Sequence, residues 1–207
     1  MRAKFPVIVL GILLAASAAC EREDETAKEG EAVPAAPAAQ VVKTPSWMDT
    51  LAAYIPALGH RNWIVVADSA FPLQVSPGIE TIVTNEDHFS VLAKVLAAVD
   101  AAKHLRPKVY FDKELAFVSE DLAPGADETR RRLGQALAGR GATPVLHEEL
   151  ISRLDQAGKT FKVVMVKTTL AVPYTSVFLE LDCGYWAPEA EAKMREKMKA
   201  AASGRGE

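Results

Sequence analysis

A histidine and an aspartate stand at the two ends of one apolar run in this chain. In the stretch ALGHRNWIVVADSAFP, residues 57–72, His60 comes shortly before the run from Trp63 to Ala67, and Asp68 follows it directly. The unperturbed pKa of histidine lies near neutrality, so His60 suits proton transfer, and Asp68 can hold an imidazole or bind hydroxyl groups. Further polar candidates stand beside other apolar runs, namely His147, Lys167, Tyr174 and Ser176. Together these residues suit acid–base chemistry that requires neither a metal nor a cofactor.

Each candidate also has a purely structural interpretation, and both interpretations stay open at this point. His60 can interact with the C-terminal dipole of a preceding helix, and Asp68 can form a turn before Pro72. His147 can cap the helix that it opens, Tyr174 can be a packed edge aromatic, and Lys167 can keep a strand edge soluble. The remaining histidines, His88 and His104, show no ligand spacing with the others, which gives no indication of a metal site.

Alternating helices and strands must position these residues. Apolar residues recur at helical spacing from Trp47 to Leu58, after Ser46, which can cap a helix. The continuous apolar run from Ile64 to Ala67 is typical of a strand covered on both faces. The alternation along the chain predicts an α/β sandwich. The other expected elements are strands at 79–83, 143–146, 163–167 and 176–181, helices at 88–102, 128–137, 148–157 and 188–202, and a hairpin that joins 109–111 to 115–118.

The first twenty residues resemble a bacterial lipoprotein signal. Arg2 and Lys4 precede an apolar segment, 6–19, that is too short to span a bilayer comfortably, and the segment ends in Ser17-Ala18-Ala19-Cys20. This pattern predicts a signal peptide over 1–20 with lipidation of Cys20. An ordinary secretory signal with an incidental Cys20 is the alternative.

The rest of the chain divides into a tether, a domain and a tail. Residues 21–45 are acidic and then rich in Ala and Pro, which predicts a disordered tether. A folded domain is expected over 46–187 and a charged helix and tail over 188–207. Glu21 after the anchor favours the outer membrane, so we expect a lipid-anchored protein that faces the periplasm. The formal net charge of -3 gives no electrostatic case for nucleic acid as a partner.

Two blocks of the sequence resemble those of the ribose pyranase/fucose mutarotase (RbsD/FucU) family. The first is Gly59-His60, a short polar step, an aliphatic strand and Asp68-Ser69, with Phe71-Pro72 beyond. The second is HEELISRLDQAGKTFKVVMVKTTLAVPYTSVFLEL, residues 147–181, in which a His opens a helix and a Tyr leads into the last strand. The resemblance covers residues 47–185 and implies a three-layer α/β/α sandwich with a central mixed sheet.

The resemblance implies an enzyme that interconverts the anomers, or the pyranose and furanose forms, of a monosaccharide. His60 is then the principal acid or base, and the sugar contacts Asp68, His147 and Tyr174, with Lys167 and Ser176 as further contacts. Proton transfer to and from a hemiacetal suits a histidine, and no cofactor is expected. These residues are expected around one depression at the carboxyl edge of the sheet. The family assembles into rings in which a neighbouring subunit helps to close the site, so a homo-oligomer is expected.

The chain departs from the family pattern at two places. Thr168-Thr169-Leu170 stands where the family commonly has Thr/Ser-Gly-Glu, and Tyr174-Thr175-Ser176 stands where it commonly has Tyr-x-Asn. A carboxylate is therefore missing, and an amide is replaced by a hydroxyl with fewer donors. The alternative function is a non-catalytic carbohydrate-binding or structural envelope lipoprotein on the same fold.

Lipidation is tested by replacing the cysteine that would carry the acyl chains. We expect Cys20→Ser to release the protein into the soluble fraction or to leave it unprocessed, because stable anchoring needs that acylated residue. Fractionation and the intact mass of the membrane-bound protein are the measurements. Unchanged membrane association with an unchanged mass would show that Cys20 is not the anchor.

Overall fold

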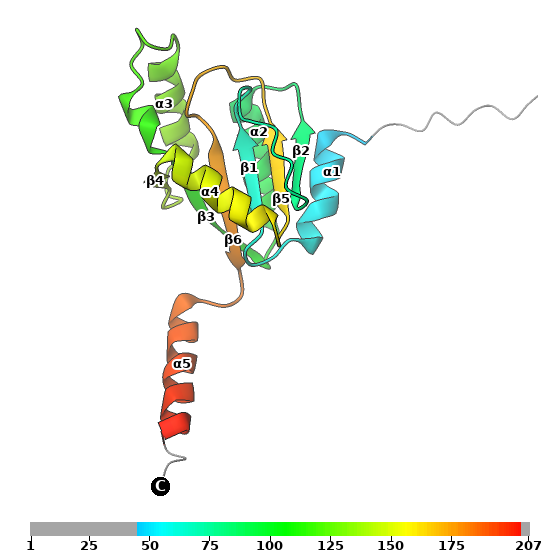
Figure 1. Cartoon of the computed structure of the whole chain (residues 1–207), viewed down its shortest axis with the longest axis vertical. Coiled ribbons are helices and arrows are strands. Elements are labelled where there is room, and N and C mark those ends of the chain that lie inside the picture. The colour runs from blue at the N-terminus through cyan, green and yellow to red at the C-terminus, as the bar shows by residue number, and fades with distance from the viewer. Residues whose placement is uncertain (1–44, 204–207) are drawn as a thin grey trace, which may run out of the picture. The chain divides into compact units, whose positions relative to one another are not determined.

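A mixed sheet of six strands forms the centre of the computed structural model, which describes residues 45–203 (Figure 1). The strand order is β2-β5-β1-β6-β3-β4, and β6 alone runs antiparallel to its neighbours β1 and β3. The strands are β1 (Trp63–Ala67), β2 (Ile79–Val83), β3 (Leu105–Asp112), β4 (Thr143–Val145), β5 (Val163–Lys167) and β6 (Val177–Cys183). The helices are α1 (Trp47–Tyr54), α2 (His88–Ala101), α3 (Ala126–Ala136), α4 (His147–Gly158) and α5 (Pro188–Ser203), with short 3-10 helices η1 (Ile55–Ala57) and η2 (Lys113–Phe117).

The two faces of the sheet bury alternate residues of the same strand. In β1, Ile64 and Val66 pack into the core that α1, α2 and α3 complete, whereas Val65 packs on the opposite face with Leu150 and Leu154 of α4. Figure 1 shows α4 on one face of the sheet and α2 on the other. All five residues of β1 are buried, which explains its uninterrupted apolar run. The predicted three-layer α/β/α sandwich with a central mixed sheet is confirmed.

Local sequence signals account for the start and the end of the first helix. The Ser46 hydroxyl accepts from the Asp49 N–H, and the Asp49 carboxylate accepts from the Ser46 N–H, which is a complete capping box. The predicted helix does not run unbroken to Leu58, because Pro56 has no N–H for the helical ladder and the chain tightens into η1.

The hairpin predicted for 109–111 and 115–118 is wrong. The first segment belongs to β3, which pairs with β6 on one side and β4 on the other, and the second segment begins in η2. The intervening Asp112-Lys113-Glu114 contains none of the Asn-Gly, Asp-Gly or Gly-Gly pairs that tight hairpin turns prefer. Strands distant in the sequence therefore pair with β3, and no local hairpin forms.

The predicted signal peptide, Cys20 and the predicted tether up to residue 44 lie outside the described residues. Within residues 45–203, no helix is long and apolar enough to cross a bilayer. The predicted terminal helix is present as α5, and none of its residues is buried.

Gly78 lies where two backbone segments approach closely. Its N–H donates to the Gly158 carbonyl at 2.8 Å, and a Cβ added at Gly78 would lie 2.2 Å from the Phe161 carbonyl oxygen. We expect Gly78→Ala to lower the free energy of unfolding by about 1–3 kcal/mol, because the backbones must move apart. The control is Gly134→Ala in α3, where a Cβ meets nothing within 4 Å and should stabilise the helix by about 0.5–1 kcal/mol. Urea denaturation measures the free energy of unfolding of both variants. An unchanged free energy of unfolding in Gly78→Ala would contradict the close approach of the two backbone segments.

Candidate functional site

Buried polar side chains gather at one edge of the sheet. Asp68 follows β1, Asp112 ends β3, Thr168 follows β5 and Ser176 precedes the antiparallel β6, so all four lie at the carboxyl ends of the parallel strands. His88 opens α2, the helix after β2. Each of the five is at most 7% exposed. Open α/β sheets bind ligands outside this edge, which makes it a candidate site.

Asp68 and Ser176 form two hydrogen bonds with one another, at the ends of the paired strands β1 and β6. The Ser176 hydroxyl donates to Asp68 Oδ2 at 2.8 Å and accepts from the Asp68 N–H at 3.1 Å. The other carboxylate oxygen, Oδ1, accepts from the Ala70 N–H at 2.9 Å. Asp68 is therefore held in one orientation, and each oxygen keeps capacity for a further donor.

A histidine–aspartate pair joins β3 to α4 at the same edge. His147 Nδ1 lies 3.0 Å from Asp112 Oδ1, and the carboxylate of Glu114 accepts from the His147 backbone N–H. The backbone N–H at this helix N-terminus is thus satisfied by Glu114, and the His147 ring does not cap the helix. Because the carboxylate engages Nδ1, the Nε2 atom of His147 is left for a ligand.

Burial gives Asp112 an unusual protonation behaviour. It raises the pKa of Asp112 from 3.8 to about 6, the hydrogen bond from His147 opposes the rise, and the charges of Glu114 and Asp68 add to it. Among the described residues, the Oδ2 atom of Asp112 has no hydrogen-bond partner. A carboxyl group that changes charge near neutrality beside an imidazole suits acid–base chemistry.

His88 is a buried, neutral histidine at the same edge. Burial lowers the pKa of His88 to about 4, although the charges of Asp68 and Asp87 oppose the shift. The Thr168 hydroxyl donates to the Ala67 carbonyl at 2.8 Å, so it accepts from the Nδ1–H of His88 at 3.0 Å. This assignment leaves Nε2 of His88 deprotonated and, within the described part of the chain, without a partner.

Tyr174 and Lys167 reach this edge in different ways. Tyr174 has a φ of 59°, a strained value for a bulky residue, and its ring lies edge-on to His147 with centroids 5.4 Å apart. Lys167 Nζ donates to the Phe71 carbonyl at 2.8 Å and so holds the loop that follows β1. The predicted contacts Asp68, His147, Tyr174 and Ser176 are therefore gathered at one edge, and Lys167 adjoins them through that loop.

His60 lies at the opposite end of the sheet. It precedes β1, whereas Asp68 follows it, and five extended residues between them span about 16 Å. The prediction that His60 shares one depression with Asp68, His147 and Tyr174 is therefore wrong within a single copy. Residues on either side of an extended strand cannot meet, however close they are in the sequence.

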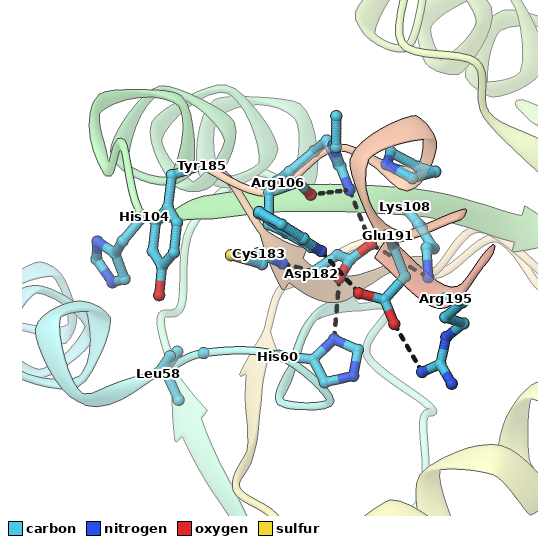
Figure 2. Close-up of a pocket in the computed structure, with 14 residues that line it drawn as sticks. Leu58, His60, His104, Arg106, Lys108, Asp182, Cys183, Tyr185, Glu191 and Arg195 are labelled. Atoms are coloured by element: carbon cyan, nitrogen blue, oxygen red, sulfur yellow. Dashed lines mark hydrogen bonds and ion pairs between the residues drawn. The ribbon is translucent and has the colours of Figure 1, made fainter. Parts of the chain in front are cut away.

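His60 instead lines a cavity of about 830 Å³ (Figure 2). Its Nδ1 lies 2.9 Å from Oδ1 of Asp182, a residue near the end of β6. On β3, Arg106 donates to Oδ2 of the same carboxylate at 3.0 Å, and Lys108 lies 3.5 Å from it. Burial works to raise the pKa of Asp182, but the Cys183 N–H, Arg106 and His60 outweigh it and hold that pKa well below its usual range.

The connection from β6 to α5 forms the other wall of the cavity. Trp186 lines it, together with Tyr185 and with Glu191 and Arg195 of α5, which Figure 2 shows. The Trp186 Nε1–H donates to Glu191 Oε2 at 2.8 Å, and Glu191 pairs with Arg195 at 2.6 Å. The cavity therefore combines aromatic rings, cations and a fixed carboxylate.

Two aspartates that hold the histidines, Asp112 and Asp182, were not predicted from the sequence. Asp112 directly follows an apolar run, as Asp68 does, and that position was a usable signal. Asp182 gave no such signal, because it lies within β6 and its partner His60 is 122 residues away. In residues 45–203, no three His, Cys, Asp or Glu side chains are arranged to hold a metal ion.

No family model matches the chain, and no curated protein matches it at a significant level. Among solved structures it is similar to Bacillus subtilis RbsD complexed with D-ribose, with a TM-score of 0.44 and 18% identity over 64% of this chain and 91% of that one. It is also similar to the Streptococcus pneumoniae fucose mutarotase in complex with L-fucose, with a TM-score of 0.45 and 19% identity over 64% and 91% of the two chains. For FucU from Bifidobacterium longum the TM-score is 0.42, and the sequence identity is 12% over 64% of this chain and 93% of that one. These similarities concern the fold, and at these values they carry nothing about activity.

The raised pKa of Asp112 predicts a pH-dependent stability. Between pH 3.8 and about 6 the folded protein holds this proton more tightly than the unfolded chain, so Asp112 contributes a fall in the free energy of unfolding as the pH rises. His88, whose pKa burial lowers from 6.5 to about 4, contributes a rise over nearly the same range, so the two contributions oppose one another. We expect Asp112→Asn to remove the falling contribution, so that the free energy of unfolding of the variant rises with pH relative to that of the wild type and exceeds it above pH 6 by up to about 3 kcal/mol, at about 1.4 kcal/mol for each pKa unit. Urea denaturation at a series of pH values measures the slope.

The matched control is Asp121→Asn, because Asp121 is exposed. This variant should keep the wild-type slope between pH 4 and about 6. A wild-type slope in Asp112→Asn would show that Asp112 is not the group responsible.

Proposed function

We propose that this protein binds a monosaccharide and exchanges its anomeric or ring forms by histidine-based acid–base catalysis. The observation that carries the proposal is the presence of two similar contacts, His60 with Asp182 at 2.9 Å and His147 with Asp112 at 3.0 Å. In both, the carboxylate engages Nδ1, so Nε2 is left to exchange a proton with a substrate.

Opening a hemiacetal ring needs a base and an acid. One group takes the proton of the anomeric hydroxyl as the bond from the anomeric carbon to the ring oxygen breaks, and the other delivers a proton to that oxygen. The substrate therefore neither gains nor loses a proton overall. His60 is the principal acid or base in this proposal, and His147 is its counterpart. Asp68 accepts from sugar hydroxyls, and the ring of Tyr174 packs against the apolar face of the sugar.

A single copy does not bring His60 to His147, because the two lie at opposite ends of the sheet. We therefore propose a ring-shaped homo-oligomer in which His60 of one copy faces the His147 edge of the next. Head-to-tail contacts between unlike surfaces close into rings. Large apolar side chains are exposed near both outer strands and support such contacts: Val75 and Val83 on the β2 side, and Leu146 on the β4 side.

A non-catalytic carbohydrate-binding role is the second candidate. The observation that favours it is the mutual hydrogen bonding of Asp68 and Ser176, both of which are buried. A carboxylate and a hydroxyl that already hydrogen-bond to one another have fewer hydrogen bonds left for a sugar than a free carboxylate and amide would have. In this role the protein holds a sugar without changing its form.

Complementation between two inactive variants tests the proposal. We expect His60→Ala and His147→Ala each to slow anomer exchange about 100-fold or more, because each removes a proton-transfer group. Mixed assemblies of the two variants should recover about a quarter of wild-type activity, because about one in four head-to-tail contacts then pairs an intact His60 with an intact His147. Exchange NMR on a panel of aldoses measures the rates.

The control mixes His60→Ala with the double variant His60→Ala/His147→Ala, which leaves every contact without an intact His60. No recovery is expected there. Equal exchange rates in wild type, variants and buffer for every sugar, combined with measurable sugar binding, would favour the non-catalytic role. Full activity of a strict monomer would contradict the shared site.

A further inference from the structure

The cavity at His60 carries an excess of cationic groups. Arg106 and Lys108 stand two residues apart on β3, so their side chains project from the same face of the sheet. With Arg195 they provide three cations, against the two carboxylates of Asp182 and Glu191. The excess does not include His60, which adds a further positive charge whenever it is protonated.

The two carboxylates of the cavity are already neutralised by neighbours. Glu191 pairs with Arg195 at 2.6 Å. Asp182 has three cationic or titratable partners within 3.5 Å, namely His60, Arg106 and Lys108. The Lys108 ammonium reaches Asp182 at the longest of these distances and is half exposed, so it can turn towards an incoming anion at little cost.

Aromatic rings beside these cations provide an apolar contact. Tyr185 is 81% exposed and Trp186 is 43% exposed, although both line the cavity. Trp186 is held in place by its bond to Glu191 and by Arg106, whose guanidinium donates to the Trp186 carbonyl at 3.4 Å. A fixed aromatic ring beside hydrogen-bonding groups suits the apolar face of a sugar ring, and the net positive charge of the cavity suits an anionic substituent.

We propose that the cavity selects a monosaccharide that carries an anionic oxygen group, a phosphate or a carboxylate. Arg106 and Lys108 bind the anionic group, and the ring of Trp186 packs against the sugar. The proposal rests on the proposed function in that the same sugar is the substrate on which His60 acts. It also narrows that function, because it excludes an unsubstituted neutral aldose as the preferred ligand.

Titration calorimetry of the full-length protein tests the selection with two matched pairs of sugars. Ribose 5-phosphate is compared with ribose, and glucuronate with glucose, so that the phosphate and the carboxylate are distinguished. We expect the preferred anionic sugar to bind at least about tenfold more tightly than its neutral counterpart. Its affinity should fall as sodium chloride is raised, because the cations are partly exposed and screened. Inorganic phosphate alone should bind more weakly than ribose 5-phosphate.

Variants connect the binding to the cavity. Lys108→Gln should weaken binding of the anionic sugar about tenfold more than binding of the neutral sugar, because it removes one charge from an exposed position. Lys159→Gln is the matched control, because it removes the same charge from an exposed lysine outside the cavity. Trp186 lines the cavity whereas Trp47 and Trp63 do not, so a fluorescence change on binding should disappear in Trp186→Phe.

The outcomes separate this inference from the proposed function. Equal affinities for charged and neutral sugars, an unchanged affinity in Lys108→Gln, or phosphate binding as tightly as ribose 5-phosphate would each overturn the selection. If the protein accelerates anomer exchange on neutral aldoses and Lys108→Gln does not change that rate, the proposed function holds and the selection of anionic sugars is wrong. If an anionic sugar binds in a manner that depends on Lys108 but its anomer exchange is not accelerated, the selection of anionic sugars is supported and the proposed catalytic role is contradicted.

Discussion

β6 runs antiparallel between β1 and β3, and both candidate sites depend on that pairing. The chain enters β6 from Tyr174 and Ser176 and so delivers them to the carboxyl edge, beside Asp68. It leaves β6 through Asp182, which lies opposite Arg106 in the register with β3 and within reach of His60. A parallel β6 would exchange these two ends and separate every one of these contacts. The orientation is stabilised by ladders on both sides and by the complete burial of Val177 to Leu179.

Burying carboxylates at the sheet edge costs free energy unless neighbouring donors compensate. Both oxygens of Asp68 accept hydrogen bonds, from Ser176 and from the Ala70 N–H. Within residues 45–203, only the Oδ1 atom of Asp112 has a hydrogen-bond partner, which is His147, and burial raises the pKa of Asp112 to about 6. Asp68 and Asp112 therefore differ, although both lie at the carboxyl ends of strands. Asp68 is held in a fixed position, whereas Asp112 suits a change of charge near neutrality.

The two histidine–aspartate pairs also differ in their surroundings. The His60 side chain is 57% exposed in a cationic cavity, whereas the His147 side chain is 23% exposed and packs against Phe71 and Tyr174. The proposed ring opening of a sugar needs one group that gives a proton and one that takes it, and proteins assign such roles to similar side chains by placing them in unlike environments. The strained φ values of Arg61, 74°, and Tyr174, 59°, place backbone strain beside both pairs.

The sequence by itself determined those features that depend on neighbours along the chain. The Ser46–Asp49 cap, the buried run of β1 and the alternation of helices with strands follow from local spacing and burial. Only the tertiary structure decided which polar residues meet. His60 and Asp68 are close in the sequence but are held apart by an extended strand. Asp112 meets His147 across 35 residues, and His60 meets Asp182 across 122. Such contacts follow from strand order and direction, which are set by how the whole sheet buries both of its faces and not by any one segment.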